Sequence, residues 1–151
     1  MATRPDPYGA FNFMVKLGDA GGQDQPSGGF SDVSGLGNEV KYSEYRAGNF
    51  KQNHVIKIPN TNTTDDVTLK RGVIGDLTLF NWIKATRDGT FVRKTVTITL
   101  LDEARSPVCS WVLTGAQPKK YVGPTLAGKG GGEVAMEELH LVAEQIDFQS
   151  T

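Results

Sequence analysis

Two histidines and one cysteine are the residues of this 151-residue chain with the greatest capacity for metal or nucleophilic chemistry. Neither His54 nor His140 belongs to a His-Glu-x-x-His helix, and the chain has no second cysteine that could complete a thiolate pair. Cys109 lies in the apolar run 108–113, a setting typical of a buried, inert thiol. We therefore predict no metal site and no catalytic nucleophile.

The glycine-rich segment 128–132 resembles a phosphate-binding loop only in part. A P-loop places Ser or Thr directly after its Gly-Lys pair, because that hydroxyl binds the magnesium ion. Here Gly130 follows Lys129. We therefore predict no nucleotide and no other cofactor.

Acidic side chains gather near the end of the chain, and paired carboxylates can perform acid–base hydrolysis of sugars. They are Glu133, Glu137, Glu138, Glu144 and Asp147. A sugar site would also need aromatic side chains nearby, and only Phe148 is close in sequence. We interpret the cluster as an acidic surface that is solvated or faces another subunit, and we predict that the chain is not an enzyme. A monomeric ligand-binding or carbohydrate-binding β-domain is the alternative from another class.

Charge is balanced overall but unevenly distributed along the chain. Sixteen basic and seventeen acidic side chains give a net charge of −1, which argues against a protein built to hold nucleic acid by phosphate contacts. Residues 41–71 carry six basic and three acidic side chains, a local charge of +3, whereas residues 133–151 carry no Lys or Arg. Opposite charges at two ends of one chain suit head-to-tail contact, although solvated faces of a monomer explain them equally.

Most segments have the period of two that is typical of half-buried strands. Loops rich in glycine are expected at 18–29 and 123–132. The last segment, 133–148, fits either a helix or a strand by periodicity alone. The predicted strands are 11–17, 30–36, 40–46, 92–101, 108–114 and 117–122.

Two further elements stand out. A helix is predicted over 76–87, with Asp76 as N-cap, a shared face of Leu79, Phe80 and Ile83, and Gly89 as the stop signal. We expect it to cover one end of the sheet. An extended hairpin arm is predicted over about 46–66, with a polar tip at 59–64 and a return through 67–71.

These elements predict one domain over 1–151, mainly β: an antiparallel barrel or sandwich with one flanking helix and a long hairpin arm. No apolar segment follows Arg4, so we expect no secretory signal and synthesis in the cytoplasm.

Several stretches, in order, resemble the tail tube protein family of contractile-tailed phages, R-type bacteriocins and extracellular contractile injection systems. The resemblance covers nearly the whole chain and decides the final segment in favour of a strand. It is carried by Asp6-Pro7-Tyr8, 11–15, 29–36, Tyr45-Arg46-Ala47-Gly48, Lys57-Ile58-Pro59, 67–72, Phe80-Asn81-Trp82, Trp111, 116–121 and 134–141.

The resemblance implies a structural subunit of an inner tube. Such subunits form hexameric rings whose sheets join into one inner barrel, and the arm reaches the adjacent ring. It implies as partners further copies of the chain, a sheath protein, baseplate, spike and tube-terminator proteins, and a cargo of protein effector or phage DNA. Assembly would begin in the bacterial cytoplasm, and a baseplate-proximal paralogue that initiates the tube is the close alternative.

A basic arm meeting an acidic surface of a neighbouring ring would help to set the register of stacking. We therefore predict oligomer contacts at Arg46, Phe50, Lys51, His54, Ile56, Lys57, Ile58, Glu137 and Glu144.

Overall fold

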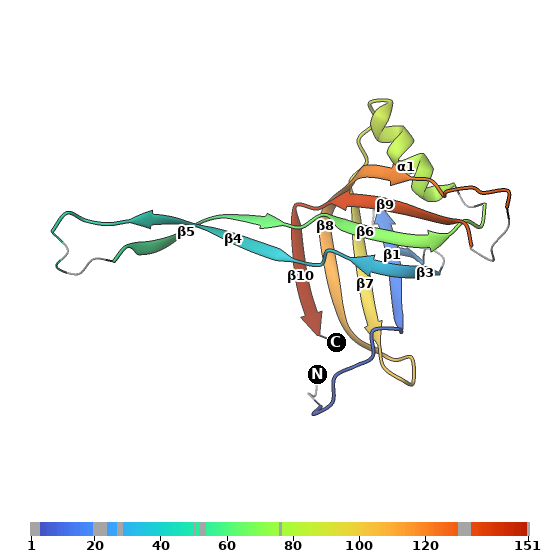
Figure 1. Cartoon of the computed structure of the whole chain (residues 1–151). Coiled ribbons are helices and arrows are strands. Elements are labelled where there is room, and N and C mark those ends of the chain that lie inside the picture. Colours follow the sequence, from blue (N-terminus) through green and yellow to red (C-terminus); the bar gives the residue numbers. More distant parts are fainter. Residues whose placement is uncertain are drawn as a thin grey trace.

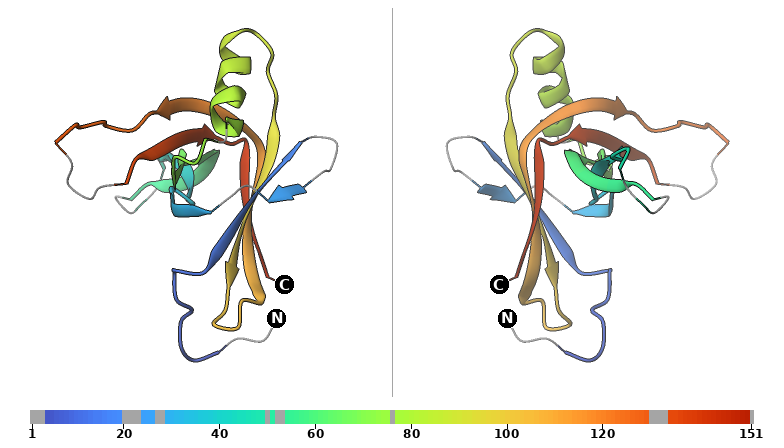
Figure 2. Two further views of the ribbon diagram at one scale, coloured as in Figure 1. Left: turned by 90° about the vertical axis from the view of Figure 1, so that its right-hand side faces the viewer. Right: turned by 90° about the vertical axis from the view of Figure 1, so that its left-hand side faces the viewer.

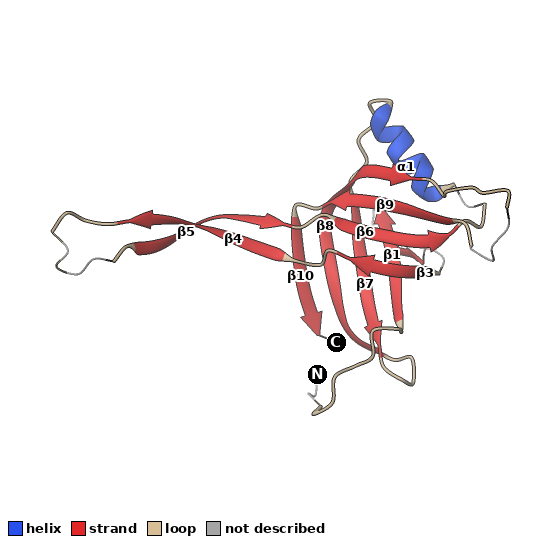
Figure 3. Cartoon of the chain, viewed as in Figure 1, coloured by secondary structure: helices blue, strands red, loops and turns tan. Residues whose placement is uncertain are grey.

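The computed structural model describes residues 4–19, 24–26, 29–49, 51, 54–75, 77–129 and 134–150. Strands predominate in this described part, every pairing between them is antiparallel, and one helix accompanies them (Figure 1, Figure 3). The prediction of a mainly β, antiparallel fold is confirmed. The elements are β1 (Phe13–Asp19), β2 (Asp24–Pro26), β3 (Phe30–Ser34), β4 (Asn38–Tyr45), β5 (Ile56–Thr64), β6 (Val67–Gly72), α1 (Thr78–Arg87), β7 (Lys94–Leu101), β8 (Pro107–Val122), β9 (Met136–Val142) and β10 (Gln145–Ser150).

Strand β8 belongs to two sheets. Its first part pairs with β7 and β10, which together with β1 and β2 make the first sheet. Its second part, 117–122, pairs with β9, and β6 and β3 complete the second sheet. Between the parts lies Gly115, whose φ of 66° is readily adopted only by glycine. The two extended pieces predicted at 108–114 and 117–122 are thus one bent strand.

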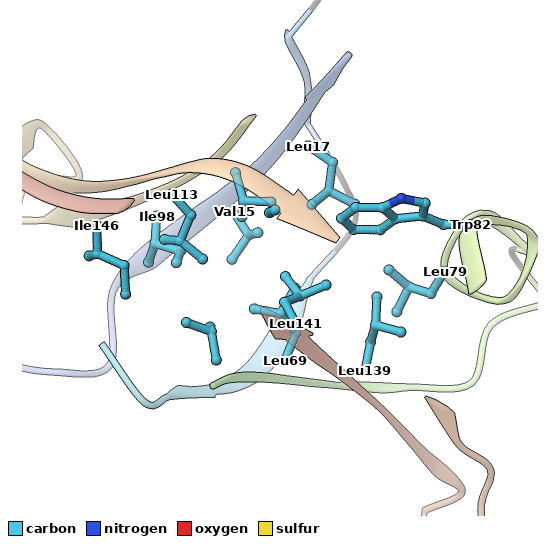
Figure 4. Packing of buried hydrophobic residues seen from close by; sticks show 13 residues of the cluster. Val15, Leu17, Leu69, Leu79, Trp82, Ile98, Leu113, Leu139, Leu141 and Ile146 are labelled. Carbon is cyan, nitrogen blue, oxygen red and sulfur yellow. The ribbon is translucent and has the colours of Figure 1, made fainter. Parts of the chain in front are cut away.

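The core lies between the facing sides of the two sheets (Figure 4). Alternation places it there: on β6, Val67 and Leu69 are fully buried, while Thr68 and Lys70, which alternate with them, are half-buried. Both Leu79 and Trp82 of α1 close one end of this core beside Leu17 and Leu139 (Figure 4). The helix therefore covers one end of the sheets, as expected.

The helix buries Leu79 as predicted, but Trp82 is the second buried residue in place of Phe80. Its buried residues are Leu79 and Trp82, whereas Phe80 is 38% exposed. The indole Nε1 of Trp82 donates a hydrogen bond to the carbonyl of Val92 at 2.8 Å, and this bond fixes which side of the helix turns inward. The helix begins at Thr78, and Leu77 at the N-cap makes no side-chain hydrogen bond. The predicted cap, Asp76, lies outside the described residues.

The C-terminal segment forms two strands, β9 and β10, in place of one. The chain bends at 143–144, so that β9 pairs with β6 and β8 while β10 pairs with β8 alone in the described structure. On β9 the buried leucines are Leu139 and Leu141, whereas Ile146 is the buried residue of β10. The buried residues are odd-numbered on β9 and even-numbered on β10 because the bend shifts the alternation. The apolar pattern of 133–148 therefore did not match that of a single strand.

The loop predictions hold only in part. Residues 24–26, within the loop predicted at 18–29, form strand β2 against β1. Residues 20–23 and 27–28 lie outside the described residues. In the loop predicted at 123–132, the described residues 123–129 form neither helix nor strand, and the remainder lie outside the description.

The arm is a ribbon of β4 and β5 that projects from one side of the body (Figure 1). The predicted polar tip at 59–64 is wrong, because those residues belong to β5 and Thr64 pairs with Asn38 at the arm's root. The far end instead lies where the described residues 46–49, 51 and 54–55 stand between β4 and β5 in the chain. Threonine favours extended backbone, so a polar Thr-rich segment can pair as a strand without packing against a core.

Candidate assembly surfaces

The root of the arm is anchored to the body by local geometry. The φ of Gly35 is 86°, and a Cβ there would clash with the carbonyl oxygen of Asp66. The amide of Asp65 donates to the carbonyl of Gly37 at 3.0 Å. The Thr64 hydroxyl also donates to the Ala143 carbonyl at 2.7 Å. These contacts set the direction in which the arm leaves the body.

A second link ties the root to the first sheet. The side-chain amide of Asn38 donates to the carbonyl of Ile146 at 3.0 Å. An ion pair between Lys119 and Asp66 crosses from β8 to the loop that follows β5. The root of the arm therefore lies where the two sheets meet.

Beyond its root, the arm exposes apolar side chains on a ribbon that no other described element covers. In the β4–β5 register, Tyr45 pairs with Ile56 and Ser43 with Ile58, so these side chains share one face. Tyr45 is 55% exposed, Ile56 42% and Ile58 46%. We call Tyr45, Ile56 and Ile58 the apolar arm stripe. A two-stranded ribbon without cover is marginally stable alone, and such a stripe therefore indicates a partner surface.

The other face of the ribbon carries an ion pair. Lys57 Nζ lies 2.9 Å from Glu44 Oε1, and both side chains are largely exposed. Tyr42, 57% exposed, lies on this face as well. Tyr42 and Tyr45 were not among the predicted contacts. An aromatic residue in a mostly polar strand is the feature of the sequence that could have identified them.

The structure brings most of the predicted contacts together on the arm. Arg46 and Lys51 lie exposed in the connection between β4 and β5, as does His54. Ile56, Lys57 and Ile58 follow on β5, whereas Phe50 lies outside the described residues. The predicted interface thus corresponds to the outer half of the arm.

Glu137 contradicts its predicted surface position. Its side chain is 5% exposed, and its carboxylate accepts a bond from Arg71 Nε at 2.6 Å and another from the Tyr121 hydroxyl at 2.6 Å. Both bonds are needed, because a buried carboxylate is strongly destabilising unless its oxygens are paired with donors. Glu137 therefore stabilises the subunit interior, and we withdraw it from the assembly surface.

The same network changes the pKa of Tyr121. The hydrogen bond from the hydroxyl to the Glu137 carboxylate, aided by burial, raises the pKa of Tyr121 from 10.0 to about 12. The ring of Tyr121 also packs edge-on against Phe80 of α1, with centroids 5.4 Å apart. The network thus joins the second sheet to the helix.

Glu144, the other predicted acidic contact, is exposed on the body. Its carboxylate lies 3.3 Å from Arg93 Nη1. Its amide donates to the Thr114 carbonyl at 2.9 Å in the bend between β9 and β10. The acidic bend therefore lies beside the root of the arm and apart from its outer half, so the two can contact different neighbours.

Both sheets end in strands with open edges. In the described structure β10 pairs only with β8, and β3 pairs only with β6. Open edges favour uncontrolled strand pairing unless another chain or segment covers them. They are the second feature that indicates assembly.

An apolar cleft lies where the first sheet extends past the second. Its volume is ≈310 Å³ and its lining includes Phe13, Leu36 and Trp111. Beside it, the Trp111 ring lies 5.1 Å from the ring of Phe148, which is 62% exposed. Further apolar side chains are exposed around α1: Val73, Ile74, Leu77, Phe80 and Phe91.

Within the described residues, no group of three or more His, Cys, Asp or Glu side chains is placed to hold a metal ion. None of the described helical structure is long and apolar enough to cross a membrane.

Comparison with known proteins identifies the fold and the family. The family model of T4-like virus tail tube protein gp19 matches residues 9–147. No curated protein sequence matches the chain.

Three solved structures are closely similar. The sheath–tube complex of an extracellular contractile injection system, PVC, in its extended state contains a chain with 26% identity and a TM-score of 0.82, covering 97% of this chain and 94% of that chain. The tube-terminating cap of the anti-feeding prophage gives 27% identity and a TM-score of 0.82 over 100% and 95%. The baseplate of the anti-feeding prophage, at 21% identity and a TM-score of 0.81 over 99% and 98%, supports the fold alone.

Proposed function

The chain belongs to the T4-like virus tail tube protein gp19 family, and we propose that it assembles as stacked hexameric rings into the hollow inner tube of a contractile injection system or phage tail. Contraction of a surrounding sheath drives this tube through a target envelope. The subunit itself performs no catalysis and binds no nucleotide, so the mechanical energy comes from the sheath.

The arm is the observation that carries this proposal. It projects from the body with the apolar arm stripe exposed, and it is anchored so that it holds one direction. A side chain stripe of this kind is stabilised when a neighbouring copy covers it. A contact from the arm of one ring to the body of the next is heterologous, and it generates an open stack rather than a closed particle.

The open sheet edges support lateral assembly within a ring. Joining the β10 edge of one subunit to the β1–β2 edge of the next satisfies the free backbone groups on both edges of the first sheet. Repeated around a ring, this pairing makes a continuous inner barrel. The chain thus has separate surfaces for lateral and for axial neighbours.

The similar structures suggest the remaining partners. They include a sheath–tube complex and a tube-terminating cap, so we propose a sheath protein and a terminator as partners of this chain. A baseplate with its spike would nucleate the tube, and a protein effector or phage DNA would pass through it. The apolar surroundings of α1, on the body away from the arm, are the surface we assign to the sheath (Figure 1). Assembly takes place in the bacterial cytoplasm.

Charge reversal on the arm tests the axial contact. We expect Lys51→Glu/Lys57→Glu to shorten or abolish tubes at low salt, because the arm would then repel the acidic surface of the adjacent ring. Tube length is measured by electron microscopy and the assembled fraction by sedimentation. Because Lys57 also pairs with Glu44, Lys51→Glu is measured alone as well.

The matched control for Lys51→Glu is Lys129→Glu, which makes the same charge change at an exposed position away from the arm and from α1. The control should assemble like the wild type. Normal tubes from the arm variant at low salt would refute the proposed axial contact.

A further inference from the structure

The outer face of the first sheet is nearly free of charge. We use this name for the side of β1, β7, β8 and β10 that points away from the core. The strand register arranges its side chains in three rows. The first row is Met14, Thr99, Ser110 and Gln149, and the second is Lys16, Thr97, Val112 and Asp147. The third is interrupted by a register shift between β7 and β8, with Gly18 paired to Thr95 on one side and Thr114 paired to Gln145 on the other.

Lys16 and Asp147 are the only charged side chains in these rows, and both belong to the second row. Lys16 lies on β1 towards one edge of the sheet, and Asp147 lies on β10 at the other edge. The Asp147 carboxylate accepts a bond from Gln145 Nε2 at 3.2 Å. No ion pair joins either charge to another described side chain, and three strand spacings separate them within one subunit.

The strands that carry these charges lie beside open backbone. Strand β10 pairs with no described strand other than β8, although Asn38 at the arm's root bonds its Ile146 carbonyl. Strand β2 covers only 16–18 of β1, which leaves 13–15 unpaired on that side. Figure 2 shows the first sheet as a twisted layer with the helix at one end and the second sheet to one side. The combined reach of lysine and aspartate spans about two strand spacings of ~4.8 Å, enough to cross the width of β2.

We propose that Lys16 of one subunit and Asp147 of the next form an ion pair at each lateral junction of the ring, on the outer face of the first sheet. This inference rests on the proposed tube, because it requires the β10 edge of one copy to meet the β1–β2 edge of its neighbour. The same row carries both charges, so in-register continuation of the sheet brings opposite charges together.

The pair also selects against the wrong junction. Two β10 edges that met each other would place Asp147 against Asp147, and two β1 edges would place Lys16 against Lys16. Like charges at such a contact are unfavourable, so the arrangement favours head-to-tail rings over two-fold dimers. Once paired, the charges leave an outer face without net charge, made of hydroxyl and amide side chains together with Met14 and Val112.

A zero-length carbodiimide cross-linker tests the contact directly, since it joins a carboxylate to an amine only when the two touch. We expect assembled wild-type protein to give an intermolecular Lys16–Asp147 cross-link, identified by peptide mass spectrometry. Lys16→Glu and Asp147→Lys should each raise the protein concentration needed for assembly by roughly tenfold, since repulsion replaces attraction at every junction of the ring. The swap Lys16→Glu/Asp147→Lys should restore assembly.

Lys129→Glu controls for net charge, and circular dichroism confirms that each variant is folded. Wild-type tubes without this cross-link, together with normal assembly of both single variants, would overturn the ion pair and leave the tube proposal standing. A swap variant that assembles no better than the single variants would also overturn it. Wild-type protein that forms neither rings nor tubes, even with sheath and baseplate proteins present, would overturn the tube proposal and this inference together.

Discussion

The Arg71–Glu137 ion pair joins β6 to β9 inside the second sheet, where the two residues are direct cross-strand partners. Tyr121 on β8 completes the network through its hydroxyl. The guanidinium of Arg71 also lies 5.7 Å from the Phe30 ring centroid on β3. A buried pair adds little stability beyond what apolar residues would supply, but breaking one is costly, so the network penalises any shift in strand register.

Tyr121→Phe tests this network. We expect the free energy of unfolding at neutral pH to fall by ~2 kcal/mol, because one oxygen of the buried Glu137 carboxylate loses its donor. The raised pKa of Tyr121 means that its contribution is complete below about pH 10 and is lost as the pH rises towards 12. Denaturant unfolding across this range should show a steeper alkaline decline for the wild type than for Tyr121→Phe. Parallel declines would contradict the assigned hydrogen bond.

The burial of a side chain could be predicted from the sequence where it depends on the residue type and its neighbours. It could not be predicted where it depends on a partner far away in the chain. The buried Cys109 followed from its apolar neighbours. Glu137 looked like one of several surface acids, because the partner that neutralises it is sixty-six residues away in the chain. Periodicity does place residue 137 in phase with Leu139 and Leu141, and a buried carboxylate could have been suspected from that phase alone.

At the scale of elements, the β4–β5 ribbon depends on its root. A ribbon without a core of its own keeps one direction only if its base is fixed, and here Gly35 allows the close approach of Asp66. Asn38 and Thr64, which pair with each other at the root, then bond the ribbon to the body. The arm can therefore act as a rigid extension of the subunit.

Gly35→Ala tests the root. We expect the variant to lower the free energy of unfolding by about 2 kcal/mol and to impair tube formation, because a Cβ is disfavoured at positive φ and meets the Asp66 carbonyl. Thermal unfolding measured by circular dichroism gives the first effect and sedimentation the second. Gly48→Ala, at a position with no atom within 4 Å of the added carbon, is the matched control. Equal stability of the two variants would contradict this account of the root.

The existence of the arm was predictable, but its pairing was not. Its polar composition showed that it lies outside the core, and the strand at 40–46 was correctly predicted. Composition does not decide whether the Thr-rich stretch 59–64 turns or pairs, and the bulge between Val40 and Tyr42 absorbs the register shift there. The bend between β9 and β10 was hidden for a similar reason, since it depends on both strands sharing β8.

In the whole molecule, the candidate assembly surfaces face different directions. The arm leaves the body on one side, α1 closes the core at another, and the first sheet presents a broad face between two edges (Figure 1, Figure 2). Each region leaves apolar or backbone groups without cover in the single chain. Open assembly with neighbours in more than one direction satisfies all of them, which is the requirement of a tube subunit.

Electron microscopy of the purified wild-type protein at high concentration, with sheath and baseplate proteins co-expressed if it stays dispersed, tests the central claim most directly. We expect rings or tubes of constant width with a clear lumen and sixfold symmetry in end-on views. Particles no larger than single subunits under both conditions would contradict the account.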